Sequence, residues 1–191
     1  MNHNKATGPD EFPVELFDAF YETCLVHFTE LLNLIYDTGQ WPSDLKNSVF
    51  ITLQRKPGAT ECENHRTISL MSHATKILLR IVMTRIRIKI RPVIAESQCG
   101  FIPDKGTRNA IFTLSMLIGR AVEVQRDVYL CFIDYSKAFD KVKHSELLGI
   151  LDQLNIDGKD LRILRNLCWE QVTAIRIDGE YTDFTEILRE M

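Results

Sequence analysis

The sequence predicts an α+β fold that is rich in helices and carries a small, mostly antiparallel sheet. Long segments with apolar residues at helical spacing dominate the chain, whereas strand-like runs are few and short. An Asp-Gly dipeptide between two strand-like runs near the C-terminus is a strong hairpin signal. The composition, 45% apolar and 26% charged over 191 residues, is that of a globular chain, and at roughly 150 residues per domain it corresponds to about one domain.

The N-terminal quarter predicts helix followed by strand. Apolar positions at helical spacing run from Pro13 to Tyr36, as one helix or as two, and Thr38-Gly39 ends the pattern. Residues 47–54 are apolar and β-branched, which predicts a buried strand. Residues 56–60 then form a loop that contains proline and glycine.

The most uneven charge distribution lies in residues 64–95, which hold seven Lys and Arg and no acid in a chain of net charge -3. Residues 72–91 predict a helix by length, although residues 85–91 alternate like a strand. On such a helix, one arc of about 80° collects four basic residues: Lys76, Arg80, Arg87 and Arg91. This face suits a phosphate-bearing partner, and the alternative is a solvated helix face. Arg85 and Lys89 fall outside the arc.

The next stretch predicts a helix and then a strand. Residues 107–125 form a helix whose apolar stripe is expected to lie in the core; the stripe consists of Ile111, Leu114, Leu117, Ile118, Ala121 and Val122. Residues 128–133 are apolar without alternation, which is typical of a strand covered on both faces. That strand is expected to end at Asp134.

The C-terminal part predicts two short helices and a hairpin. The helices span about residues 145–154 and 159–169 and are separated by Asp157-Gly158. The hairpin joins residues 172–177 to the residues from Tyr181 onward through Asp178-Gly179.

Several classes of protein are disfavoured. The five cysteines are widely spaced and odd in number, which argues against a disulfide scaffold and a zinc site; Cys24, Cys131 and Cys168 are expected to be small buried residues. No apolar stretch is long enough for a membrane span, and the N-terminus lacks the features of a signal peptide. We therefore expect an intracellular protein without a membrane partner, in the nucleus or the cytoplasm.

The stretch most informative about chemistry is residues 132–140, Phe-Ile-Asp-Tyr-Ser-Lys-Ala-Phe-Asp. A strand that ends in a carboxylate holds the charge on a rigid element, as a ligand of a divalent metal requires. The following turn would expose backbone N–H groups, which bind phosphate, and the ring of Phe139 would wall a nucleotide pocket. The alternative is an aspartate that caps a turn or is simply solvated.

This stretch resembles the first catalytic motif of reverse transcriptases from non-LTR retrotransposons, the long-interspersed-element type. Three further segments resemble motifs of the same family, in the family's order. They are residues 5–10 (Lys-Ala-Thr-Gly-Pro-Asp), which resemble the opening motif; residues 55–58 with 66–70 (Arg-Lys-Pro-Gly, Arg-Thr-Ile-Ser-Leu), which resemble the nucleotide-binding fingers; and residues 98–101 with 105–107 (Gln-Cys-Gly-Phe, Lys-Gly-Thr), which resemble the segment leading into the palm.

The resemblance implies a partial right-hand polymerase fold, with fingers and an incomplete palm, and roles for single residues. Asp134 would be a ligand of both catalytic Mg2+ ions, and Tyr135 would contribute its backbone carbonyl. Lys56 and Arg66 would hold the triphosphate, although Lys56 could be a solvated loop lysine. Phe139 would be the steric gate against a ribose 2'-hydroxyl. The backbone lining the nucleotide would be that of Ser136, Lys137, Ala138 and Phe139.

The implied activity is RNA-directed DNA synthesis by two-metal phosphoryl transfer. Its partners would be an RNA template, a DNA primer and deoxynucleoside triphosphates, with the basic helix face following template or primer phosphates. The single domain would comprise fingers over about residues 5–72, palm over about 73–150, and a return toward the fingers over 151–191. The sequence does not indicate an oligomeric state.

Two later motifs of the family are missing from the sequence. There is no Gln-Gly segment and no Tyr-x-Asp-Asp, and the sequence ends at Glu190-Met191, where Gln-Gly would be due. Thr67 also replaces the proline usual in the fingers motif. We therefore expect an N-terminal piece of a reverse transcriptase, inactive as a polymerase alone. A non-catalytic nucleic-acid-binding module and a decayed retroelement remnant are the alternatives.

Overall fold

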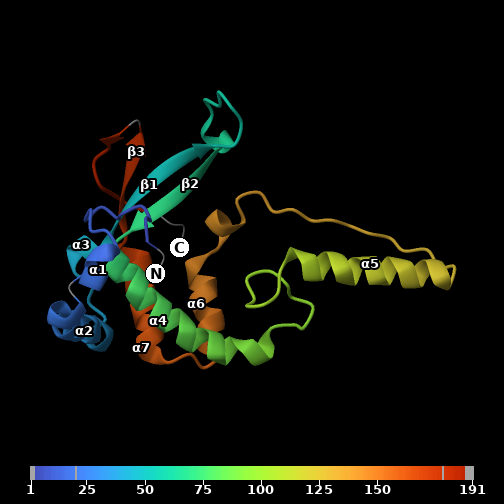
Figure 1. The fold of residues 1–191 in the computed structure, drawn as a ribbon, viewed down its shortest axis with the longest axis horizontal. Coiled ribbons are helices and arrows are strands. Elements are labelled where there is room, and N and C mark those ends of the chain that lie inside the picture. The colour runs from blue at the N-terminus through green and yellow to red at the C-terminus, as the bar shows by residue number, and fades with distance from the viewer. Residues whose placement is uncertain (1–2, 20, 178, 188–191) are drawn as a thin grey trace. The chain divides into compact units, whose positions relative to one another are not determined.

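The computed structural model describes residues 3–19, 21–177 and 179–187, and the side chains of residues 21–24 and 140 lie outside the description (Figure 1). The chain divides into two compact units. The first unit comprises residues 1–89 and 143–191, and the second unit comprises residues 90–142.

The first unit is built on a five-stranded sheet in the order β2-β1-β3-β4, with β5 also paired to β3. β1 (Asn47–Gln54) pairs antiparallel with β2 (His65–Met71) and parallel with β3 (Val172–Ile177). β3 pairs antiparallel with β4 (Glu180–Tyr181) and with β5 (Thr185–Glu186). Three of these four pairings are antiparallel, so the predicted sheet type is confirmed.

The strand at residues 47–54 has the predicted bounds, and the hairpin near the C-terminus is also confirmed. Arg176 pairs with Tyr181 and Ile177 with Glu180, which leaves two residues for the turn. The first of them, residue 178, lies outside the described residues. β2 was not predicted as a strand, because its polar and charged residues hide the apolar pattern.

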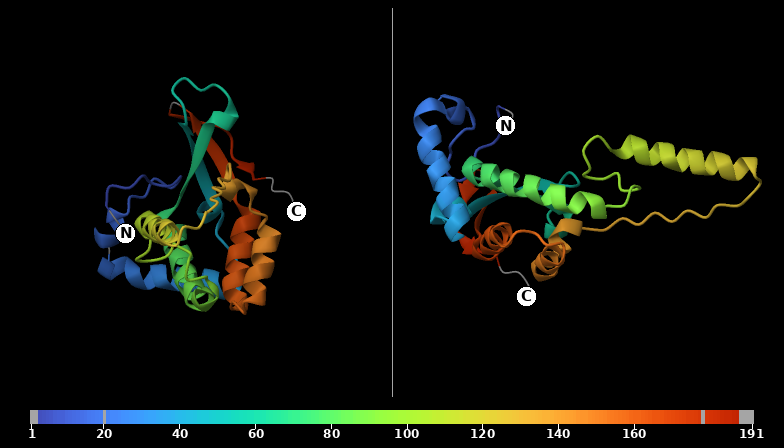
Figure 2. Two further views of the ribbon diagram at one scale, coloured as in Figure 1. Left: turned by 90° about the vertical axis from the view of Figure 1, so that its right-hand side faces the viewer. Right: turned by 90° about the horizontal axis from the view of Figure 1, so that it is seen from below.

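The helices of the first unit also follow the sequence pattern, apart from the four-residue helix at residues 43–46, which was not predicted. They are α1 (Glu15–Ala19), α2 (Tyr21–Thr38), α3 (Ser43–Lys46), α4 (His73–Ile90), α6 (His144–Gln153) and α7 (Gly158–Glu170). The apolar pattern after Pro13 therefore belongs to two helices. Residues 85–90 lie in α4, so the strand-like alternation of residues 85–91 does not correspond to a strand. α6 and α7 lie side by side (Figure 1, Figure 2). Among the described helices, none is long and apolar enough to cross a membrane.

The core of the described structure lies in the first unit. The side chains of Ile35 on α2, Val82 on α4 and Ile163 on α7 are at most 1% exposed. Trp41, which follows α2, is also buried, and its indole N–H donates to the backbone oxygen of Ile163 at 3.2 Å. The core therefore joins segments that are distant in the sequence.

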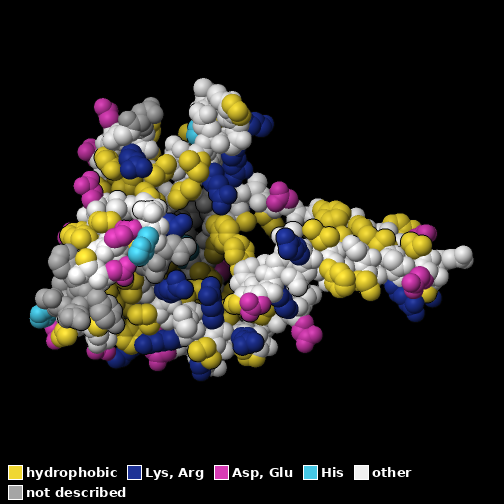
Figure 3. Space-filling view, viewed as in Figure 1, with side chains coloured by type: hydrophobic (Ala, Val, Ile, Leu, Met, Phe, Trp, Pro, Cys, Tyr) yellow, Lys and Arg dark blue, Asp and Glu magenta, His cyan; other side chains and the backbone are white. Residues whose placement is uncertain are grey.

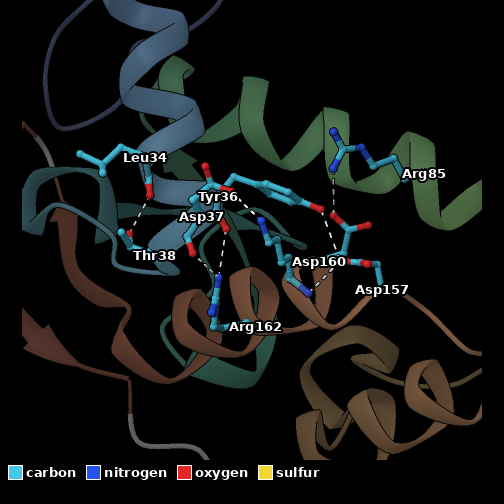
Figure 4. Close-up of polar contacts among 9 residues, drawn as sticks. Leu34, Tyr36, Asp37, Thr38, Arg85, Asp157, Asp160 and Arg162 are labelled. Carbon is cyan, nitrogen blue, oxygen red and sulfur yellow. Dashed lines mark hydrogen bonds and ion pairs between the residues drawn. The ribbon is translucent and has the colours of Figure 1, made fainter.

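The C-terminal end of α2 is held by α7 (Figure 4). Gly39 adopts the left-handed φ of +74° after the helix, and its N–H donates to Ile35 O at 2.7 Å. The guanidinium of Arg162 donates to the carbonyl oxygens of Tyr36 and Asp37 at 3.2 and 2.6 Å. These bonds satisfy carbonyls that a helix end leaves unpaired. A Cβ on residue 39 would lie 2.5 Å from Arg162 Nε, so a larger residue would displace the Arg162 side chain as well as strain the φ of +74°.

The second unit contains α5 (Thr107–Glu123), which confirms the predicted helix. Its predicted burial is wrong. The stripe that was expected in the core is open to solvent, with Ile111, Leu117 and Val122 exposed by 59, 61 and 71%. Figure 3 shows hydrophobic side chains gathered along this helix. Helical periodicity shows which face could be buried, but burial requires a partner for that face.

The predicted strand at residues 128–133 is also wrong. This segment is extended but belongs to no described strand, and the side chains of Tyr129 and Phe132 are 92 and 82% exposed. No backbone hydrogen bond joins residues 127–136 to other described residues. A strand covered on both faces needs neighbouring strands to pair its backbone groups, and the described residues supply none here.

The prediction for the cysteines is partly wrong. Cys131 is exposed, because the segment that carries it is not covered, and Cys168 is only partly buried. The side chain of Cys24 lies outside the described residues.

Candidate active site

Lys56 lies in the connection between β1 and β2, at the start of a β-turn. The N–H of Ala59 donates to the carbonyl oxygen of Lys56 at 3.2 Å. Pro57 occupies the second position of the turn, and Gly58, with φ of +73°, occupies the third. This is the residue pattern that a type II turn requires. Lys56 is exposed on this turn, and no ion pair or side-chain hydrogen bond engages it within the described part of the chain.

Arg66 lies on β2 and shares a sheet face with Arg176. Arg66 is paired with Leu53, and Arg176 is paired with Ile51 two residues earlier on the same strand. Paired residues lie on one face of a sheet, and so do residues two apart. Arg66 is exposed, and none of the described residues forms an ion pair with it. The sheet therefore presents two guanidinium groups on one face.

A cavity of about 300 Å3 opens on the same face. Its lining residues are Thr7, Gly8, Glu11, Val49, Leu70, Arg176 and Tyr181. A Cβ on residue 8 would lie 2.6 Å from the backbone of Met71, so only glycine lets the N-terminal segment lie this close to the end of β2. The sequence pattern missed Arg176 and Tyr181. The available signal was an arginine inside the otherwise apolar strand 172–177.

The predicted basic helix face lies mainly on α4. Arg80 and Arg87 are exposed, while Lys76 is partly buried, and burial lowers the pKa of its ammonium group. Arg91 follows the end of α4 and lies in a 3-10 turn (Arg91–Val93) that belongs to the second unit. The buried residues of α4 are His73, Thr75, Leu78, Val82 and Ile86.

Arg85, which the pattern did not place, packs in a hollow between helices (Figure 4). Its guanidinium carbon lies 4.7 Å from the ring centroid of Tyr36, and its Nη1 lies 3.5 Å from Oδ1 of the buried Asp160. Burial and, after it, the Asp160 carboxylate raise the pKa of Tyr36. Lys89 lines the same hollow, whose volume is about 290 Å3. Arg85 thus connects α2, α4 and α7 rather than serving a basic face.

Asp134 lies in the extended segment of the second unit. Its side chain is exposed and makes no hydrogen bond or ion pair within the part of the chain that the structure describes. The next residue, Tyr135, is 74% exposed. The predicted turn forms after them: Lys137 has a left-handed φ of +52° and precedes a 3-10 turn (Ala138–Lys141). The Lys141 ammonium group donates to Ser136 Oγ at 3.4 Å across this turn.

The ring of Phe139 contacts Phe101 edge to face. Their centroids are 5.8 Å apart, and the ring planes are inclined by 84°. Phe101 comes from the segment that resembles the family's entry into the palm, so two of the motifs meet within the second unit. Phe139 remains 73% exposed. This aromatic pair was not predicted, because Phe101 and Phe139 are far apart in the sequence.

The residues present do not by themselves fit a divalent metal ion. Magnesium prefers six oxygen ligands in an octahedral arrangement, and a two-metal centre requires several carboxylates. Asp134 and the carbonyl of Tyr135 supply two ligands. No group of three or more His, Cys, Asp and Glu residues that could hold a metal ion occurs among the described residues.

The predicted residues therefore divide between the two units. The first unit contains Lys56, Arg66, Lys76, Arg80 and Arg87, and the second unit contains Arg91 and residues 134–139.

Comparison with known proteins decides the family. Residues 54–188 match the profile of the family described as "Reverse transcriptase (RNA-dependent DNA polymerase)". The chain belongs to this family. The resemblance seen in the sequence motifs is confirmed, and the α+β architecture is consistent with a partial reverse transcriptase fold. Reverse transcriptases generally use divalent metal ions.

Similar proteins come from retroelements. This chain is 25% identical over 182 residues to the transposon TX1 uncharacterized 149 kDa protein of Xenopus laevis. It is 28% identical over 146 residues to the retrovirus-related Pol polyprotein from type-1 retrotransposable element R2 of Nasonia vitripennis, and 26% identical over 152 residues to the RNA-directed DNA polymerase from mobile element jockey of Drosophila funebris. The alignments cover 95, 76 and 78% of this chain, but only 14, 14 and 16% of those proteins.

Proposed function

We propose that this chain carries the fingers and the first half of the palm of a retroelement RNA-directed DNA polymerase. The whole protein would extend a DNA primer on an RNA template with deoxynucleoside triphosphates. The observation that carries this proposal is the family match over residues 54–188, which includes both Arg66 and Asp134. The fingers would span about residues 5–72 and the palm about 73–150, with residues 151–191 returning toward the fingers.

Lys56 and Arg66 are proposed to bind the triphosphate. Both are exposed cations on one hairpin, with no anionic side chain paired to them in the described structure, so a phosphate need not displace an existing partner. The planar guanidinium suits bidentate contact with phosphate oxygens, whereas lysine acts as a point charge. The cavity beside Arg176 and Tyr181 would extend this surface.

Asp134 and the carbonyl of Tyr135 are proposed as Mg2+ ligands in the complete domain. The exposed carboxylate supports this role, while the lack of an acidic cluster among the described residues means that the ion needs further ligands. Residues 136–139 would line the nucleotide, with Phe139 against the ribose. The 191-residue chain alone is expected not to polymerise nucleotides.

Three basic residues of α4, Lys76, Arg80 and Arg87, are proposed to contact template or primer phosphates, and so is Arg91. Arg80 and Arg87 are exposed, which supports a surface contact. Such binding is independent of sequence and weakens steeply as salt rises. The same face favours the second candidate function, a non-catalytic RNA-binding module.

Primer extension separates the two functions. The assay uses a polypeptide that contains these residues within a complete polymerase domain, with an RNA template, a DNA primer, deoxynucleotides and Mg2+. Asp134→Asn should abolish extension and leave RNA binding intact. Asp127→Asn, a change of the same kind at another exposed aspartate of this segment, should leave extension unchanged. Undiminished product with Asp134→Asn would refute the role of Asp134.

A further inference from the structure

The loop that precedes α5, residues 95–106, is closed by its own hydrogen bonds. The side-chain amide of Gln98 donates to the carbonyl oxygen of Gly100 at 3.1 Å, and the ammonium group of Lys105 donates to the carbonyl oxygen of Glu96 at 2.6 Å. These bonds hold the backbone of the loop in a defined conformation. The loop carries the Gln-Cys-Gly-Phe motif, which has no role in the proposed function.

Phe101, the last residue of this motif, adopts a left-handed backbone conformation with φ of +59°. A bulky residue rarely adopts this conformation, and such strain persists only where the surrounding structure fixes it. Burial is not the reason, because Phe101 is 86% exposed. The loop therefore presents an aromatic ring at the surface rather than in a core.

The ring of Phe101 contacts only part of the Phe139 ring. The two rings lie in the same unit, with their centroids 5.8 Å apart and their planes inclined by 84°, which is a favoured edge-to-face arrangement. Phe139 remains 73% exposed in this contact. An exposed side chain without a neighbour changes rotamer within nanoseconds. The contact therefore restrains the Phe139 ring and still leaves it open to a ligand.

Exclusion of a single hydroxyl group requires a ring at a fixed position, since a displacement of about 1 Å changes which groups can be accommodated. We propose that Phe101 is a positioning residue, which holds the Phe139 ring where it excludes a ribose 2'-hydroxyl. Phe101 thereby contributes to the selectivity for deoxynucleotides over ribonucleotides. This inference rests on the proposed function, because it takes Phe139 to lie against the ribose.

Nuclear magnetic resonance of the 191-residue chain tests the contact without any polymerase activity. Nuclear Overhauser effects should join the ring protons of Phe101 and Phe139, and Phe101→Leu should shift the ring signals of Phe139 because a neighbouring ring current is lost. Phe112→Leu, the same change at a phenylalanine of α5 that is 67% exposed, is the matched control and should leave these signals in place. Absence of the Overhauser effects would overturn the inference.

Single-nucleotide primer extension tests the selectivity, with a polypeptide that contains these residues within a complete polymerase domain. The measured quantity is kcat/KM for a deoxynucleotide divided by kcat/KM for the matching ribonucleotide. Phe101→Leu removes the aromatic pair and should lower this ratio by about twofold to tenfold. Phe101→Tyr retains a ring and should keep the ratio. A merely structural defect would lower both kcat/KM values together and leave the ratio unchanged.

A double variant tests whether Phe101 acts through Phe139. Phe139→Ala should itself lower the ratio, and Phe101→Leu added to it should lower the ratio no further, because the ring that Phe101 positions is gone. Phe112→Leu should leave the ratio unchanged.

The outcomes separate this inference from the proposed function. An unchanged ratio in Phe101→Leu, or a further loss in the double variant, would overturn the inference alone, since deoxynucleotide extension would still support the proposed function. Failure of the unchanged polypeptide to extend the primer would refute the proposed function and the selectivity role together.

Discussion

The two units of the chain differ in what their apolar side chains touch. In the first unit, α2, α4, α6 and α7 each bury apolar side chains, and Ile163 and Val82 are completely buried. In the second unit, no described residue is buried, although α5 has a regular apolar face. Removal of apolar surface from water stabilises a fold by about 25 cal/mol per Å2. The stability of the described structure therefore resides mainly in the first unit.

The comparison shows that a regular apolar pattern is necessary for burial but does not produce it. The stripe on α5 is as regular as the buried positions of α4, yet only α4 has partners in the described structure. The two parts of the proposed site differ in the same way, in whether the segment that carries them has packing partners. Arg66 lies on a paired strand, whereas Asp134 lies on an extended segment without strand partners.

The largest expected effect is the difference between two isoleucine truncations. Ile163→Ala removes a completely buried side chain from α7 and should lower the free energy of unfolding by about 2–5 kcal/mol. Ile118→Ala makes the same chemical change on α5, where the side chain is 40% exposed, and should cost about 0.5 kcal/mol or less. Urea unfolding of the two variants measures both values. Equal costs would mean that the second unit has a core after all.

Triphosphate binding should depend on the first unit. Loss of a hydrogen bond to a charged group costs about 1.5–3 kcal/mol, so Arg66→Ala should weaken deoxynucleoside triphosphate binding by about 10-fold to 100-fold. Calorimetric titration of the chain measures this affinity. Arg165→Ala, at another exposed arginine of the first unit, is the control and should bind as the unchanged chain does. Equal affinity of the Arg66 and Arg165 variants would contradict the assignment of Arg66.

Acid should destabilise the first unit through His73. This ring is 2% exposed, and neither of its nitrogens has a hydrogen-bond partner in the described structure. Burial, followed by the Lys76 ammonium group, lowers the pKa of His73 from 6.5, while Asp10 and Glu15 oppose the shift. Below pH 6.5 the unfolded chain therefore binds more protons at this residue than the folded chain does, so stability falls as the pH drops.

The size of this effect has a limit. One group changes the free energy of unfolding by at most about 1.4 kcal/mol per pH unit. Unfolding measured between pH 7 and pH 5 should show a smaller decrease in His73→Gln than in the unchanged chain. The same decrease in both would rule out His73 as the cause.

A smaller effect is expected at the start of α7. Asp157 accepts a hydrogen bond from the N–H of Lys159 at 2.8 Å and caps the helix. Asp157→Ala should lower the free energy of unfolding by about 1 kcal/mol. Asp152→Ala, an exposed aspartate in α6, should change it by less than about 0.5 kcal/mol. If both substitutions cost the same, the cap does not stabilise α7.

Local patterns predicted most helices of both units and the strands β1 and β3, because helix and strand periodicity are properties of neighbouring residues. β1 and α4 were found in this way. The role of Arg85 could not be predicted, since it depends on Tyr36 and Asp160, which are far away in the sequence. The face shared by Arg66 and Arg176 likewise depends on the register of β1 with two other strands.

The error at residues 128–133 has the same origin. The apolar composition of residues 128–133 is typical of a strand covered on both faces, but composition does not show whether neighbouring strands are present. Among the described residues, no neighbouring strand pairs with residues 128–133.

Hydrogen exchange, followed by mass spectrometry at a concentration where the chain is monomeric, tests the difference between the units most directly. The amides of β1 (Asn47–Gln54) should be strongly protected, because this strand is paired on both sides. The amides of residues 128–133 should exchange near the rate of an unstructured peptide. Protection of residues 128–133 equal to that of β1 would show that the segment is a paired strand in the monomer, contrary to the structure described here.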